Sequence, residues 1–192
     1  MDEKDVDLLV DAARAGGGWA FGRLWERLSP AVHAYLRHRG CPDPEDTTSE
    51  VFLAAFRQIE RFAGDGRGFR AWLFTIAHHK AVDQLRRGPH RHESPLDVVD
   101  DGRTASSAED SALASLGDSE VARLLAMLTA DQRAVLLLRV VGELSLEETA
   151  AAVGKPVGAV KQLQHRGIAT LRRKLSAEPV TSETSAAIAR LR

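Results

Sequence analysis

Apolar residues recur every three or four positions along much of the chain, the spacing of one face of an α-helix. In the first ninety residues this pattern predicts helices over Ala20–Arg39, Val51–Ile59 and Phe69–Leu85. Pro30 predicts a kink or a break in the first of these, and Pro42–Asp46 is a turn with helix-start chemistry. The positions expected to face a core in the second and third helices are Val51, Phe52, Ala55, Phe56 and Ile59, then Trp72, Leu73, Ile76, Ala77, Val82 and Leu85.

The same periodicity returns near the C-terminal end, where it predicts four helices. They cover Val121–Leu128, Asp131–Val141, Leu146–Val153 and Val157–Leu175. Two helix starts carry a capping box, in which Thr129 precedes Gln132 and Ser145 precedes Glu148 by three residues. Gly154 is a suitable residue just past a helix end. Alternating strand patterns are absent from the sequence, so the predicted fold class is all-α.

A compositional break separates the two helical parts. Gly88–Asp118 is rich in small polar residues, and residues 91–118 carry seven acidic residues against Arg91 and Arg103. Such a segment is typical of a flexible linker. We therefore predict two small helical domains, residues 1–88 and 119–176, joined by a flexible acidic linker at 89–118 and followed by a disordered tail at 177–192.

Composition narrows the class of protein. The chain has 192 residues, 28% of them charged, with a net charge of −1. No apolar run approaches the ~20 residues of a membrane span, and the acidic N-terminus does not resemble a secretory signal. The single cysteine, Cys41, excludes an intramolecular disulfide; a lone thiol is either a redox switch or, as we favour, a packing residue. We expect a cytoplasmic protein.

The charge distribution points to nucleic acid. Six basic residues and no acidic one lie between Lys155 and Ala177, and a nearly neutral protein with one basic face can still bind DNA there. The string LSLEETAAAVGKPVGAVKQLQHRGIATLRRKL, residues 144–175, has the order helix, glycine-containing turn, helix. This order predicts a helix-turn-helix whose second helix enters the major groove. The residues expected to contact DNA are Lys155, Lys161, Gln162, Gln164, His165 and Arg166.

These segments resemble the extracytoplasmic-function (ECF) class of the sigma-70 family, transcription-initiation factors of bacterial RNA polymerase. Residues 144–173 resemble region 4, which reads the −35 promoter element. DPEDTTSEVFLAAFRQIERF, residues 43–62, resembles the polymerase-binding region 2.2. FRAWLFTIAHHKAVDQLRR, residues 69–87, resembles regions 2.3 and 2.4, which open and read the −10 element. All three occur in the family's order.

The resemblance implies partners and site residues. Core RNA polymerase would be bound through its β′ clamp and β flap, promoter DNA through both domains, and an anti-sigma factor would regulate the chain. Residues implied in the polymerase contact are Asp46, Ser49, Glu50, Phe52 and Leu53. Those implied in −10 recognition are Arg67, Arg70, Lys80, Asp83, Arg86 and Arg87. No cofactor, metal or enzymatic activity is implied.

Three positions depart from the family pattern. His79 stands where an asparagine is common, Leu163 where many members carry arginine, and Gly167 where alanine is usual. A glycine in mid-helix costs roughly 0.5–1 kcal/mol relative to alanine. We expect these changes to alter the preferred promoter sequence while leaving the framework intact.

Two other classes of function compete with this hypothesis. A metal enzyme would use the clustered His78, His79, His90 and His92, but the spacing of a zinc hydrolase motif is absent. An ordinary helix-turn-helix regulator would explain residues 144–175 and leave the first ninety unexplained. Within the first domain, Trp72 and Phe74 are better placed as core residues than as platforms for bases.

Overall fold

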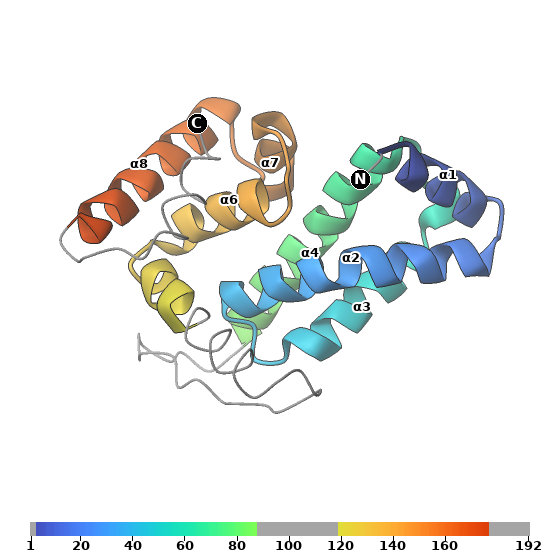
Figure 1. Ribbon diagram of the computed structural model, residues 1–192, viewed down its shortest axis with the longest axis horizontal. Helices are drawn as coiled ribbons and strands as arrows, with labels where there is room; N and C mark the ends of the chain where they lie inside the picture. Colours follow the sequence, from blue (N-terminus) through green and yellow to red (C-terminus); the bar gives the residue numbers. More distant parts are fainter. Residues whose placement is uncertain (1–2, 88–118, 177–192) are drawn as a thin grey trace.

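The structure, a computed structural model, describes residues 3–87 and 119–176, and every regular element in these two ranges is helical (Figure 1). The predicted all-α class is confirmed, while the predicted linker and tail lie outside the described residues. The first range contains α1 (Glu3–Arg14), α2 (Gly18–Arg39), α3 (Pro44–Phe56), the short 3-10 helix η1 (Ile59–Arg61) and α4 (Gly66–Arg87). The second contains a helix at residues 119–126, then α6 (Ala130–Val140), α7 (Leu146–Val153) and α8 (Val157–Leu175).

Local sequence chemistry sets the ends of α2 and α3. Gly40 ends α2 in the left-handed conformation, with φ of 86°, which glycine adopts without a Cβ penalty. Asp43 then caps α3, because its side chain accepts a hydrogen bond of 2.9 Å from the backbone N–H of Asp46. The predicted turn is confirmed. The predicted break at Pro30 is wrong, because α2 continues through this residue.

The buried residues of the first range form one apolar core. The largest fully buried side chains of this core are Leu24, Tyr35, Leu36, Phe52, Phe69, Leu73 and Phe74. The pattern analysis missed α1, whose Val10 and Ala13 are buried against this core. Phe56 and Leu85 were predicted to be core residues and are instead 51% and 43% exposed. Both lie at or near helix ends, where the covering neighbours run out.

The second range follows the predicted capping pattern closely. Both capping boxes are complete, at Thr129 and at Ser145, and Gly154 ends α7 with φ of 64°. The bounds of α7 and α8 agree with the prediction. Capping works here because side chains satisfy the backbone N–H groups that the first helical turn leaves without partners.

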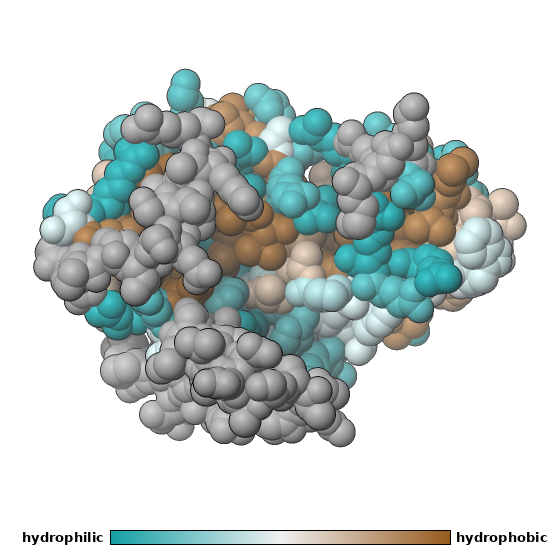
Figure 2. All heavy atoms as spheres, viewed as in Figure 1, coloured by the Kyte–Doolittle hydropathy of each residue, from teal (hydrophilic) through white to brown (hydrophobic). Residues whose placement is uncertain are grey.

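The two ranges pack against each other. Leu137, Leu138, Leu144 and Ala152 belong to the same buried cluster as the core of the first range. The main contacts place α4 against α7 and α2 against α6, as Figure 1 shows. In Figure 2 apolar residues gather near the middle of the view, where the two parts meet, with polar residues around them. The sequence pattern did not predict this arrangement.

Candidate nucleic-acid and protein interfaces

An exposed stripe runs along α3 on the side away from the core. It consists of Asp46, Ser49, Leu53 and Phe56, which are spaced by three or four residues and therefore share one helix face. Leu53 is 49% exposed and Phe56 is 51% exposed. An apolar centre with a polar and acidic edge is the composition of a protein-binding surface.

Two of the residues predicted for this surface are placed differently. Phe52 is only 1% exposed, and its ring packs 4.6 Å from that of Trp25, so Phe52 supports the surface from within the core. Glu50 forms an ion pair of 2.7 Å with Lys80 of α4. The sequence analysis missed Phe56 as a surface residue. The available signal was its position three residues after Leu53, which puts the two residues on the same helix face.

The basic residues at the start of α4 contact the second part of the chain. The guanidinium of Arg70 donates to the carbonyl oxygens of Gly142 and Val141 at 2.7 and 3.0 Å and lies 3.4 Å from the carboxylate of Glu143. Arg67 forms an ion pair of 3.3 Å with Glu148 of α7. Both arginines were predicted to contact the −10 element, and both are engaged here within the chain.

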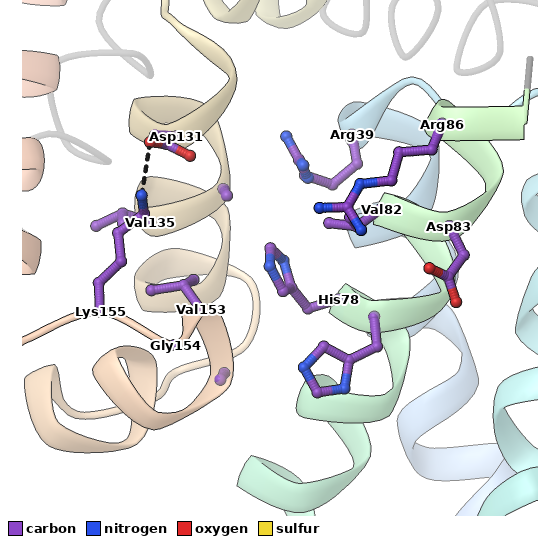
Figure 3. Close-up of a pocket in the computed structure, with 13 residues that line it drawn as sticks. Arg39, His78, Val82, Asp83, Arg86, Asp131, Val135, Val153, Gly154 and Lys155 are labelled. Carbon is purple, nitrogen blue, oxygen red and sulfur yellow. Dashed lines mark ion pairs between the residues drawn. The ribbon is translucent and has the colours of Figure 1, made fainter.

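Further along α4, the predicted residues border a pocket between the two parts. Figure 3 shows Arg39 of α2 and His78 and Arg86 of α4 extending toward α6, with Asp83 also on α4. The pocket has a volume of about 590 Å³ and is also bordered by Asp131 and Lys155. Lys80 lies on α4 in the ion pair with Glu50, and Arg87 is the last residue of α4. The six predicted residues therefore lie on one helix, and Arg67, Arg70 and Lys80 have partners on different elements.

Aromatic rings near α4 pack against one another. Phe74 is fully buried, which confirms its expected place in the core. Trp72 is half-buried and stacks on Phe62, with ring centroids 5.0 Å apart, while Phe69 meets it edge-on at 5.7 Å. These rings hold the segment before α4 in place.

The second helix of the helix-turn-helix presents a polar face to solvent. Lys161, Gln162, His165 and Arg166 are exposed and together form the reading face of α8. They border an open groove of about 610 Å³ that also includes Arg172. Their spacing of one, three and four residues puts four hydrogen-bonding side chains on one side of the helix. Gln, Arg and Lys are the side chains that hydrogen-bond base edges and phosphates.

Two predicted DNA-contacting residues are held by partners in the same part of the chain. Nε of Arg139 on α6 donates to the Gln164 side-chain oxygen at 3.3 Å. Lys155 forms an ion pair of 2.9 Å with Asp131 (Figure 3). Arg139 of α6 thus helps to position α8 through this hydrogen bond. The sequence does not reveal this role, because it depends on the proximity of Arg139 to Gln164 in space.

Two of the three positions that depart from the family pattern are Leu163 and Gly167. Both face the interior of the second part of the chain, residues 119–176. Leu163 packs against the small core formed by Val135, Ala150 and Val160. Gly167 is buried, and a Cβ there would lie 2.9 Å from Cδ1 of Leu136. Glycine therefore permits a close approach of α8 to α6. The third departure, His79, is exposed at the pocket between the two parts.

Burial shifts the pKa of His78, Tyr35 and Cys41. His78 is 8% exposed, and its Nδ1 lies 2.9 Å from the Tyr35 hydroxyl. Burial lowers the pKa of His78 to about 4, assisted by the positive charge of Arg39. Burial likewise raises the pKa of Tyr35 and raises the pKa of the Cys41 thiol to about 11. A protonated, buried Cys41 behaves as a packing residue, because the thiolate is the reactive form.

Neither metal ligands nor membrane spans are found in the described parts of the chain. Between residues 3 and 87 and between 119 and 176, no three histidine, cysteine or acidic side chains gather as a metal site would require. His90 and His92 lie outside these ranges. None of the helices in the described ranges combines the length and hydrophobicity that crossing a bilayer requires.

Comparison with known protein families agrees with the division of the chain into two helical parts. The family described as Sigma-70 region 2 matches residues 24–90, and the family described as Sigma-70, region 4 matches residues 118–171. The chain is 34% identical to the ECF RNA polymerase sigma factor SigD of Mycobacterium tuberculosis over 184 residues, or 92% of this chain and 87% of SigD. The chain belongs to the ECF sigma factors of the sigma-70 family.

Two further relatives place this sigma factor within its family. It is 39% identical to the ECF RNA polymerase sigma factor BldN of Streptomyces coelicolor over 170 residues. That match covers 87% of this chain but 64% of BldN, so the chain spans less than two thirds of BldN. The solved structure of CnrH in complex with the cytosolic domain of CnrY has a TM-score of 0.67 and 30% identity, covering 90% of this chain and 99% of CnrH. CnrH is a sigma factor of Cupriavidus metallidurans.

Proposed function

We propose that this sigma factor directs core RNA polymerase to specific promoters in the cytoplasm, reading the −35 element as duplex and opening the −10 element. The observation that carries the proposal is the reading face of α8. Lys161, Gln162, His165 and Arg166 are exposed together on the second helix of a helix-turn-helix. This is the element that enters the major groove in such motifs.

The first part of the chain supplies the proposed polymerase contact and the −10 contact. The exposed stripe of α3 presents Leu53 and Phe56 within a polar edge, which suits the β′ clamp. We assign six residues of α4 to the −10 element: Arg67, Arg70, Lys80, Asp83, Arg86 and Arg87. Arginine side chains neutralise phosphates and stack on bases, so that binding energy offsets the few kcal/mol needed to unstack a base.

The proposed partners are core RNA polymerase, through its β′ clamp and β flap, promoter DNA and an inhibitory protein of the anti-sigma type. The last is supported by the complex of the similar protein CnrH with the cytosolic domain of CnrY. The sigma factor would act without catalysing a reaction of its own and without a cofactor.

Run-off transcription tests the proposal. Purified core RNA polymerase is given fragmented DNA from the source genome, with and without the sigma factor. We expect new start sites that share a pair of upstream sequence elements. Absence of new starts, with an intact sigma factor that does not bind core enzyme, would favour a plain DNA-binding regulator.

Variants of the reading face make the test specific. The double variant Lys161→Ala and Arg166→Ala should reduce the new starts at least tenfold, because each base contact is worth about 1–3 kcal/mol. The matched control is Arg14→Ala with Arg23→Ala, which removes two positive charges at exposed ion pairs of α1 and α2. Normal promoter use by the reading-face variant would overturn the assignment of α8.

A further inference from the structure

The first helix of the chain, α1, packs against the start of α4, the helix that carries the proposed −10 residues. Val10 and Ala13 of α1 are buried in the core. Gly66, the first residue of α4, is buried as well. The match to Sigma-70 region 2 covers residues 24–90, so α1 lies before the matched segment and its role has to be inferred from its contacts.

The contact between these two helices centres on one carboxylate. Oδ1 of Asp7 on α1 accepts a hydrogen bond of 2.6 Å from the backbone N–H of Gly66, 59 positions along the chain. The first N–H groups of a helix have no partner within the helix and carry partial positive charge. Because Gly66 is buried, losing this acceptor would leave a buried donor without a partner. Asp7 thus acts as a cap that one helix supplies to another.

The other capping bonds at the start of α4 come from the adjacent sequence. Oδ1 of Asp65 accepts from the backbone N–H of Gly68 at 2.7 Å, and the carbonyl oxygen of Asp65 accepts from the N–H of Phe69 at 2.8 Å. Asp65 is therefore the local N-cap. The first turn of α4 is held by two aspartates, one next to it in the chain and one on a distant helix.

The backbone of α4 approaches α1 too closely for a side chain to fit between them. A Cβ added to Gly66 would lie 2.8 Å from Oδ1 of Asp7 and 2.8 Å from Cγ1 of Val6. Glycine therefore lets the first turn of α4 lie directly against α1. It follows that the position of this turn depends on α1, and above all on the hydrogen bond from Gly66 to Asp7.

This first turn leads into two of the residues assigned to the −10 element. Arg67 directly follows Gly66, and Arg70 lies about one turn further along α4. Side chains that bind a ligand have to be held within about 0.5 Å of their working positions by the residues around them. The ion pair of Arg67 with Glu148 is exposed, and exposed ion pairs contribute little to such positioning. The backbone at Gly66 is the better support.

We propose that Asp7 is a positioning residue for the −10 contact, acting through the Gly66 N–H without touching DNA itself. It fixes the first turn of α4 and with it Arg67 and Arg70. The proposal rests on the proposed function, because it takes these two arginines as −10 residues. It predicts that loss of the Asp7 acceptor weakens −10 binding and leaves −35 binding by α8 unchanged.

Hydrogen exchange followed by NMR tests the contact without polymerase or DNA. In Asp7→Ala we expect the Gly66 amide to exchange about tenfold faster than in the parent, because a buried donor without a partner favours local opening. Asp7→Asn should stay near the parent, because its side-chain oxygen still accepts a hydrogen bond. The matched control is Asp11→Ala, at an exposed ion pair with Arg14 on the same helix, which should also exchange like the parent. Equal exchange in Asp7→Ala and the parent would overturn the proposal.

Binding to two labelled probes then separates positioning from a general loss of structure. The probes are a single strand with the −10 element and a duplex with the −35 element, both taken from promoters that run-off transcription identifies. With core polymerase present, we expect Asp7→Ala to bind the −10 probe about tenfold more weakly than the parent. Its affinity for the −35 probe should match the parent. Asp7→Asn and Asp11→Ala should match the parent on both probes.

The outcomes distinguish this proposal from the proposed function. If the parent binds the −10 probe and Asp7→Ala binds it equally well, only the role of Asp7 is overturned. Equal losses on both probes would also overturn that role, because they indicate a general loss of structure. If run-off transcription yields no promoter, the proposed function fails and the role of Asp7 in −10 binding fails with it, while hydrogen exchange still reports the contact with Gly66.

A second variant covers the case in which Asp7→Ala does not fold, as a melting curve followed by circular dichroism would show. Asp7→Glu keeps the carboxylate but moves it by one methylene group, away from the position in which it meets the Gly66 N–H. This variant should show the same selective loss on the −10 probe. Binding of both probes as tightly as the parent would then overturn the proposal.

Discussion

Gly167 lies in the middle of α8, where alanine ordinarily stabilises a helix. Its buried position against Leu136 reverses that expectation, because the added methyl group would have to displace a packed side chain. At the residue scale, neighbours therefore decide what a residue contributes. Gln164 and Lys155 make the same point: both were predicted to contact DNA from residue type, and both have side-chain partners within the domain.

Replacing Gly167 with alanine should lower the free energy of unfolding by about 1 kcal/mol. Overpacking costs about 1–3 kcal/mol, and the gain in helix propensity returns about 0.5–1 kcal/mol. Urea denaturation followed by circular dichroism measures the change.

Gly158→Ala is the matched control on the same helix, because a Cβ there meets nothing within 4 Å. This variant should be as stable as the parent or slightly more stable. A stabilised Gly167→Ala variant would show that α8 moves away from α6 at little cost.

At the scale of elements, helix ends were the most predictable feature. Ser145 and Glu148 satisfy each other's backbone N–H groups, with hydrogen bonds of 3.1 and 2.6 Å. The interaction needs only four consecutive residues, so sequence alone reveals it. The break predicted at Pro30 did not occur, because the effect of this proline depends on distant neighbours. Leu24, Leu28 and Val32 bury one face of α2 on both sides of the proline, and that burial outweighs one missing hydrogen bond.

Ser145→Ala should lower the free energy of unfolding by about 1 kcal/mol, the usual cost of losing an N-cap. Chemical denaturation measures this loss. Ser145→Asp serves as the control, since aspartate is an equally good N-cap, and should remain near the parent. If both variants lost the same stability, the capping hydrogen bond would not be the source of the effect.

At the scale of the whole molecule, packing changes the chemistry of buried groups. His78 on α4 meets Tyr35 from α2, and Arg39, His79 and Asp131 also act on its charge. The protein lowers its pKa from 6.5 to about 4. The unfolded chain therefore binds a proton in a range where the folded protein does not, and stability must fall as the pH falls through that range.

Between pH 6.5 and pH 4, His78 should reduce the free energy of unfolding by at most roughly 3 kcal/mol. Above pH 6.5 its contribution should be constant. The measurement is denaturant unfolding at a series of pH values for the parent and for His78→Gln, whose difference isolates this group from the carboxylates. An exposed histidine that is not among the groups acting on His78 provides the control, His165→Gln on α8, which should follow the parent. Identical pH profiles for the parent and His78→Gln would contradict the assignment.

The sequence by itself determined the helices other than α1, the caps at Thr129 and Ser145, the helix-turn-helix and the resemblance to the ECF sigma factors. Each depends on residues near one another in the chain, through helical periodicity or through capping over four residues. Tertiary structure alone decided that Phe56 is exposed, that Gly167 admits α8 close to α6, and that Arg70 binds the end of α6. These features arise from contacts between residues distant in the chain, such as the 72 positions that separate Arg70 from Gly142. Local pattern carries no information about which surfaces will meet at such separations.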